Sequence, residues 1–100
     1  MILEIAMLPV RRGQEEAFEA AFAEAAPIIA SMPGYLGHEL HRSLDAPERY
    51  ALLVRWRTLE DHTIGFRQAP AYREWRRLLH HFYEPPPTVE HFARVSPAPR

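Results

Sequence analysis

The fold is decided by residues 49–60, which read RYALLVRWRTLE. Bulky apolar residues alternate with other residues along the first eight positions, which is typical of a strand with one buried face. The residues of that face are Tyr50, Leu52, Val54 and Trp56. Directly after the strand, Thr58 is a suitable N-cap, and Glu60 and Asp61 suit the first turn of a helix. The stretch therefore predicts a strand that passes directly into a helix.

Further strands and a further helix flank this stretch. The strands are expected over residues 2–10, 35–43 and 88–95. Helical spacing of apolar residues begins at Gln14 and stops at Pro33, and Pro27 is expected to kink or restart that helix. The helical region after the third strand restarts at Pro70, and its apolar stripe reaches Phe82.

The order of elements is β-α-β-β-α-β, which is the split βαβ or ferredoxin-like arrangement of the α+β class. Right-handed crossovers place both helices on one face of a four-stranded antiparallel sheet and leave the other face uncovered. The first and third strands are interpreted as apolar on both faces, with Leu3, Ile5 and Met7 on one face of the first. An uncovered apolar sheet face is typical of an interaction surface, so we predict a homodimer whose sheets pack face to face. One domain is expected over residues 1–95, followed by a flexible tail over residues 96–100.

Composition excludes several classes of function. The chain has 100 residues, no cysteine and no lysine, and all 12 of its basic residues are arginine. These absences exclude disulfides, cysteine-based metal sites, thiolate nucleophiles and Schiff-base lysine chemistry. A formal net charge of -1 argues against a nucleic acid as the partner. The amino-terminal segment lacks a basic region, and no apolar run is long enough for a membrane span. We therefore expect a cytoplasmic protein without a membrane partner.

Two segments carry a resemblance to a known family. Residues 33–37, PGYLG, lead into the second strand, and residues 55–60, RWRTLE, end the third. With the order of elements, they resemble the antibiotic biosynthesis monooxygenase (ABM) domain over residues 1–95. Residues 49–92, with HTIGFR at 62–67, are similar to one bacterial branch of that family. The resemblance implies a dimeric α+β barrel. It also implies one of the family's activities: cofactor-free oxygenation of quinols or aromatic polyketides, haem degradation or isomerisation.

The family's site residues transfer to this sequence only in part. Trp56 matches the tryptophan of the family's third strand, and His62 stands where the polyketide-type enzyme has a tyrosine beside its substrate. Arg76 approximately matches a further arginine of that enzyme, whereas Leu52 stands where it has an asparagine. The haem-degrading branch needs a tryptophan and a histidine on the second helix, and neither stands at its position here. The resemblance therefore favours cofactor-free oxygenation over haem degradation.

The residues could equip such an oxygenase without a metal or organic cofactor. The reaction needs a base that removes a phenol or quinol proton, a cation beside the resulting anion, and a dry cavity for reaction with O2. His62 is the predicted base because imidazole titrates near neutral pH, and Arg76 or Arg67 is the predicted cation. The cavity is expected between the sheet and the second helix, and this hypothesis requires His62 and Trp56 to face it together. The predicted aromatic walls are Trp56, Phe66, Tyr72, Trp75 and Phe82.

Other interpretations of the same residues remain open. The aromatic stripe of the second helix is also typical of a packed core, and His62 near a helix start is also typical of a surface histidine. The chain could then be a non-catalytic dimer that binds a small molecule or a partner. It could also be an isomerase or lyase of a small metabolite that uses His62 as a base without O2.

The six histidines do not show the spacing of a metal site. His80 and His81 are adjacent in a predicted helix and point about 100° apart, so they cannot chelate one ion together. A site shared across the dimer between His38 or His41 and His91 remains open. We predict no metal site within one chain.

Overall fold

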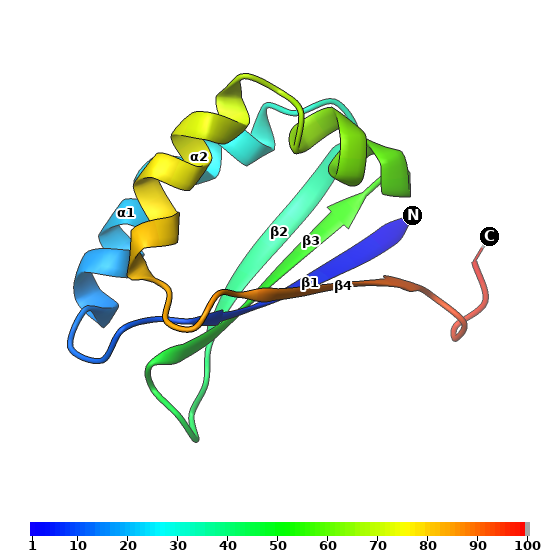
Figure 1. The fold of residues 1–100 in the computed structure, drawn as a ribbon. Coiled ribbons are helices and arrows are strands. Elements are labelled where there is room, and N and C mark those ends of the chain that lie inside the picture. Colours follow the sequence, from blue (N-terminus) through cyan, green and yellow to red (C-terminus); the bar gives the residue numbers. More distant parts are fainter. Residues whose placement is uncertain (100) are drawn as a thin grey trace.

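The computed structural model describes residues 1–99, which form a four-stranded antiparallel sheet with helices on one face (Figure 1). The strands are β1 (Ile2–Pro9), β2 (Tyr35–Arg42), β3 (Arg49–Trp56) and β4 (Thr88–Ala93), in the spatial order β2-β3-β1-β4. The helices are α1 (Glu15–Ala30), the π-helical turn η1 (Asp61–Phe66), α2 (Ala71–Leu79) and the short 3-10 helix η2 (His80–Phe82). The predicted ferredoxin-like α+β fold is confirmed.

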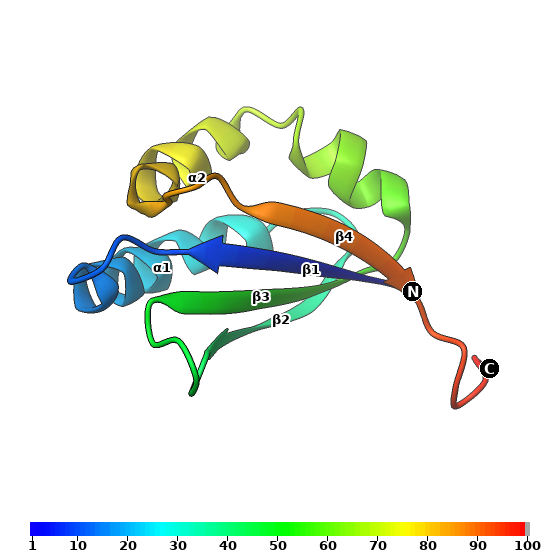
Figure 2. The ribbon, with the colours of Figure 1, turned by 60° about the horizontal axis from the view of Figure 1, so that its bottom comes forward.

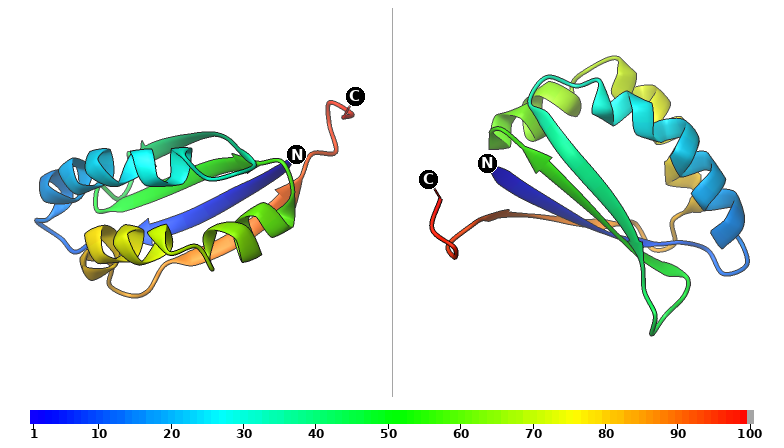
Figure 3. Two further views of the ribbon diagram at one scale, coloured as in Figure 1. Left: turned by 90° about the horizontal axis from the view of Figure 1, so that it is seen from above. Right: turned by 180° about the vertical axis from the view of Figure 1, so that it is seen from behind.

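The elements form two layers. Helices α1 and α2 lie side by side over the sheet, as the view from above shows (Figure 3). The η1 turn follows β3 directly and leads over the end of the sheet to α2 (Figure 1). In the described part of the chain, the opposite face of the sheet carries no helix (Figure 2). The sheet layer is therefore open on one side.

The strand register separates the residues of the two faces. Glu4, Ala6 and Leu8 of β1 are buried beneath the helices, and their β3 partners are Val54, Leu52 and Tyr50. The intervening residues point to the open face because side chains alternate along a strand. Those residues include Leu3, Ile5, Met7, Ala51, Leu53 and Phe92. Both faces of β1 are thus largely apolar, whereas the open face of β3 carries Ala51 and Leu53 between Arg49 and Arg55.

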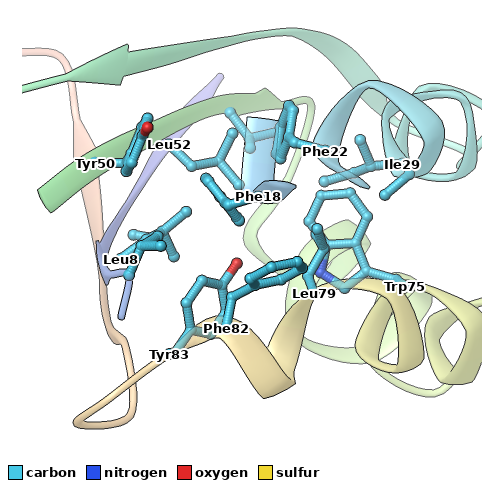
Figure 4. Close-up of a cluster of buried hydrophobic side chains, with 14 of the residues drawn as sticks. Leu8, Phe18, Phe22, Ile29, Tyr50, Leu52, Trp75, Leu79, Phe82 and Tyr83 are labelled. Carbon is cyan, nitrogen blue, oxygen red and sulfur yellow. The ribbon is translucent and has the colours of Figure 1, made fainter. Parts of the chain in front are cut away.

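Aromatic side chains fill the space between the layers (Figure 4). The ring of Phe18 on α1 has its centroid 4.9 Å from that of Tyr50 on β3 and 5.7 Å from that of Phe82 on η2. Fully burying a side chain of this size contributes about 2–3 kcal/mol to stability. These contacts fix α1 and η2 to the same part of the sheet.

Pro27 does not restart the first helix, because α1 continues through it to Ala30. Pro27 and Ala23, whose carbonyl it cannot bond, are both exposed. On the solvent side that carbonyl can tilt toward water, so the lost hydrogen bond is compensated. The helix ends at Ala30, and the backbone N–H of the capping residue Ser31 donates to the carbonyl of Ile28 at 3.2 Å. The predicted restart is therefore wrong.

Beyond β4, residues 94–99 are exposed and form no helix or strand. Arg100, the last residue of the predicted tail, lies outside the described residues. Within residues 1–99, no helix combines the length and the apolar character that crossing a bilayer requires.

Candidate functional site

The η1 turn is fixed at the end of β3 by reciprocal hydrogen bonds. The Thr58 backbone N–H donates to Asp61 Oδ2 at 3.1 Å, and the Asp61 N–H donates to Thr58 Oγ1 at 3.2 Å. This pair of bonds is a capping box, and it confirms Thr58 as the cap of the helical region. Gly34, with φ at +83°, packs so closely on Asp61 that a Cβ there would overlap the carboxylate. The loop before β2 thus holds the start of η1.

The π-helical turn directs two of its side chains toward the sheet. The Arg67 backbone N–H donates to the carbonyl of His62, five residues earlier, at 3.2 Å. His62 and Phe66 are buried, whereas Ile64 is 52% exposed. Single π turns inside helical segments frequently occur at functional sites. Here the turn places an imidazole against the buried face of the sheet.

Glu4 is a buried carboxylate at the end of the core, with 5% of the residue exposed. Its Oε1 accepts a hydrogen bond from Trp56 Nε1 at 2.9 Å and lies 3.4 Å from His62 Nε2. Burial raises the pKa of Glu4, and the Trp56 hydrogen bond and the charge of Arg67 oppose this rise. A carboxylate with a raised pKa can accept a proton under milder conditions than an exposed one.

His62 lies between Glu4 and a second histidine. Its ring stacks on Trp56 with centroids 5.4 Å apart, and its Nδ1 lies 2.8 Å from His91 Nε2 on β4. Burial, followed by the charges of Arg67 and His91, lowers the pKa of His62 to about 3. His62 is therefore a neutral imidazole near neutral pH. One of the two rings donates a hydrogen bond to the other across the 2.8 Å contact.

A cavity of about 310 Å³ opens in front of this pair, between the sheet and α2. Its polar end contains Glu4, His62 and Arg67. Its aromatic lining residues are Phe66, Tyr72, Trp75, His80 and Tyr83, and Pro86, Pro87 and Val89 also line it. The cavity thus combines aromatic walls with acid–base groups at one end, as ligand sites commonly do.

Comparisons with known proteins agree with this architecture. The family model described as antibiotic biosynthesis monooxygenase, ABM, matches residues 1–78. The chain belongs to the ABM family. The uncharacterized protein YczJ of Bacillus subtilis (strain 168) is 54% identical over 95 residues, which are 95% of this chain and 100% of YczJ.

Solved structures of ABM proteins share the fold over nearly their whole length. A Bordetella bronchiseptica protein named for this family is 42% identical, with a TM-score of 0.90 over 94% of this chain and 96% of that one. SnoaB from Streptomyces nogalater, a cofactor-independent oxygenase solved as an asparagine-to-alanine mutant, is 20% identical, with a TM-score of 0.81. That alignment covers 96% of each chain. At this identity, the likeness to SnoaB shows the fold alone.

The structure brings most of the site residues predicted from the sequence to one cavity. The predicted residues that line it are His62, Phe66, Arg67, Tyr72 and Trp75. Trp56 lies behind the imidazole of His62, donates to Glu4 and does not line the cavity. The requirement that His62 and Trp56 face the cavity together is therefore not met. Phe82 packs in the core, and Arg76 is exposed on α2, outside the cavity.

Sequence reasoning missed Glu4 and did not link His91 to His62. A signal for both was present in the strand pattern. Glu4 has the same parity as the core residues Ala6 and Leu8, and His91 has the same parity as Val89. The β1–β4 register then places Glu4 directly beside His91.

The histidines considered for a shared metal site have other neighbours. His38 Nδ1 lies 2.6 Å from the Tyr35 hydroxyl, and His41 Nε2 lies 2.9 Å from Glu39 Oε1. His91 lies on β4, the edge strand opposite β2, and contacts His62. Within residues 1–99, no three His, Asp or Glu side chains are grouped as metal ligands.

Proposed function

We propose that this ABM protein is a cofactor-independent monooxygenase acting on a small aromatic or quinol substrate in the cavity beside α2. The observation that carries the proposal is the buried Glu4–His62 pair at the polar end of an aromatic-lined cavity. Such a pair can accept a proton from a phenolic hydroxyl where water is largely excluded. A cytoplasmic location, expected from the sequence, is part of the same proposal.

The cavity residues have complementary roles in this reaction. Loss of the hydroxyl proton to the Glu4–His62 pair leaves an electron-rich phenolate, and Arg67 at the same end stabilises its charge. The phenolate passes an electron to O2, and the radical pair recombines to a peroxide on a ring carbon while the rings of Phe66 and Trp75 exclude water. The peroxide takes up a proton, and loss of water with the hydrogen of the same carbon breaks the O–O bond and leaves one oxygen atom on the ring as a carbonyl. Arg67 takes the role of the cation here because it lines the cavity, whereas Arg76 does not.

The size and lining of the cavity favour a small substrate. Its 310 Å³ lies at the lower end of the volumes of ligand pockets, which run from about 300 to 1,000 Å³. Leu52 lines the cavity where the resemblance placed an asparagine in the polyketide-type enzyme. The polar contacts to a substrate would therefore come from Glu4, His62 and Arg67. A substrate of one or two rings suits this arrangement better than a larger polyketide.

Oxygen consumption with a panel of quinols tests the proposal. We expect uptake by the wild-type protein and a loss of at least about tenfold in His62→Ala. His81→Ala is the matched control, because His81 is exposed outside the cavity. Equal rates in wild type and His62→Ala would remove His62 from the mechanism.

A non-catalytic binding module is the second candidate, and the surroundings of His62 favour it. One ring nitrogen lies by Glu4, the other lies by His91, and the pKa is lowered to about 3, so His62 alone is a weak base. Binding of aromatic ligands without O2 uptake would support that candidate. Conversion of a ligand in the absence of O2 would indicate the isomerase or lyase predicted as an alternative.

We also propose that two copies associate through the open face of the sheet. That face carries the largely apolar side chains of Leu3, Ile5, Met7, Ala51, Leu53 and Phe92, of which Met7 is 38% exposed and Phe92 44%. A contiguous apolar patch of this kind is typical of a protein–protein interface. Homodimers are common in this family, which supports the same arrangement.

A further inference from the structure

We propose that Glu4 is the group that accepts the substrate proton and that His62 and His91 connect Glu4 to solvent. This inference rests on the proposed oxygenase function and assigns the base within it. The three side chains come from β1, η1 and β4, and they form one continuous line from the cavity to the edge of the sheet.

One carboxyl oxygen of Glu4 is free to accept a hydrogen bond. Its Oε1 accepts the Trp56 N–H and lies next to His62. Among residues 1–99, Oε2 has no hydrogen-bond partner, and every fully buried side-chain oxygen or nitrogen has one. Oε2 therefore retains accessible surface. Because Glu4 lines the cavity, that surface faces the place where a substrate hydroxyl would lie.

Glu4 is the more basic group of the Glu4–His62 pair. Burial raises the pKa of Glu4 and lowers that of His62, so a proton that enters the pair resides on the carboxylate. The other charged or titratable groups near Glu4 are Arg67, which follows η1, and His91 on β4. Tyr72 and His80 face the same cavity from α2 and η2. Arg67 acts on both groups. Its positive charge repels a protonated His62, which is a cation, whereas a protonated Glu4 is neutral and is not repelled.

His62 and His91 form the route by which the proton on Glu4 reaches solvent. If His62 Nδ1–H donates to His91 Nε2, its Nε2 presents a lone pair to Glu4. The O–H bond of the substrate then breaks as an O–H bond forms on Glu4. Rotation of the carboxyl group about the Cγ–Cδ bond then turns this O–H from the cavity toward His62 Nε2, which takes the proton. The Nδ1 proton of His62 passes to His91 Nε2, and the Nδ1 proton of His91 leaves to water. His91 is half-buried on an edge strand, so its ring reaches solvent while a ligand fills the cavity.

The decisive experiment follows the titration of the protein itself and needs no substrate. In NMR spectra recorded against pH, we expect the Glu4 carboxyl carbon to titrate above the ordinary glutamate range. The imidazole nitrogens of His62 and His91 should show an inflection at the same midpoint, and Glu4→Gln should remove it from both rings. Glu39→Gln is the matched control, because Glu39 pairs with His41 outside the cavity.

Titration of Glu4 in the ordinary range would overturn the inference, and so would persistence in Glu4→Gln of the ring-nitrogen inflection at the Glu4 midpoint. With any quinol that the wild type oxidises, Glu4→Gln should lower kcat at least about tenfold, and His91→Asn should change its pH profile. Absence of oxidation by the wild type would contradict the proposed oxygenase function and, with it, the role of Glu4 as its base. The proton connection among Glu4, His62 and His91 would still be decided by the titration.

Discussion

Two neighbouring residues of the site hold opposite pKa shifts for the same physical reason. Burial penalises the charged form of each group, so it raises the pKa of Glu4 and lowers that of His62 to about 3. The Trp56 N–H and Arg67 moderate the effect on Glu4 by favouring its carboxylate. The result is a neutral imidazole beside a carboxyl group that can change its protonation state.

The two shifts predict a pH dependence of stability with opposite signs. Unfolded His62 binds a proton below pH 6.5, whereas folded His62 binds one only near pH 3, so its contribution to stability is lost as the pH falls through that window. Glu4 binds its proton more tightly when folded, so it adds stability as the pH falls toward 4.5. In urea unfolding between about pH 4 and 7, His62→Gln should lower the slope of the unfolding free energy against pH. The change is at most about 1.4 kcal/mol per pH unit. Glu4→Gln should raise the slope, and identical slopes in all three proteins would contradict both assignments.

Arg67 and Arg76 are expected to differ in their contribution to catalysis. Arg67 lines the cavity and Arg76 is exposed on α2 outside it, so only Arg67 can lie beside a developing phenolate. Arg67→Ala should lower kcat/KM for quinol-dependent O2 uptake by about tenfold or more, while Arg76→Ala should remain within about twofold of wild type. Steady-state oxygen-electrode measurements decide between them. The reverse pattern would restore the assignment of Arg76 that the family resemblance suggested.

Local sequence patterns were sufficient to predict some residues of this site but not the contacts of Glu4, which lies at its centre. The helical spacing of Tyr72 and Trp75 was sufficient to place them on the inner side of the helix after Pro70. Glu4 could have been placed by parity alone, since it has the same parity along β1 as the buried residues Ala6 and Leu8. Its contacts with His62 and His91 join segments 58 and 87 residues away, and no local pattern encodes such pairings.

At the scale of elements, the site depends on how η1 begins. Its capping box joins Thr58 to Asp61, and the carboxylate of Asp61 rests on the backbone of Gly34 in a different loop. The sequence predicted a helix start at Thr58. It did not predict the π-helical turn, because residues 62 and 66 share a face in an α-helix as well. The wider turn is fixed by tertiary contacts, including the stacking of His62 on Trp56.

Substitution of two glycines tests the anchoring of η1. Gly34→Ala should destabilise the protein by about 2–3 kcal/mol, because alanine is strained at positive φ and its Cβ displaces the Asp61 cap. Gly13→Ala is the matched control, since Gly13 has φ at +88° and a Cβ added there would have no atom within 4 Å. It should cost only the backbone strain of about 1 kcal/mol. Urea unfolding of both variants measures the difference, and equal costs would exclude the proposed role of the Gly34–Asp61 contact.

At the scale of the whole molecule, the sheet has two faces with different tasks. One face carries the core, the cavity and the Glu4–His62 pair beneath the helices, and the other carries an uncovered apolar patch. The order of elements and the two-sided apolar pattern of β1 were readable from the sequence because each is a local periodicity. The expected apolar open face of β3 is interrupted by Arg49 and Arg55. The position of the cavity depends on how far α2 stands from β1, which side-chain packing determines and local periodicity does not.

The uncovered face predicts a dimer that one substitution should dissociate. Leu53 is half-buried at the centre of this face, paired with Ile5 on β1 and with Glu39 on β2. Leu53→Glu would place a second carboxylate beside Glu39 and bury it against a partner, which costs several kcal/mol. Sedimentation equilibrium at micromolar concentration should show a dimer for wild type and a folded monomer for Leu53→Glu. Leu44→Glu, in a loop position that is 98% exposed, introduces the same charge away from the sheet and should leave the dimer intact. A monomeric wild type at these concentrations would show that the apolar face does not associate with a second copy.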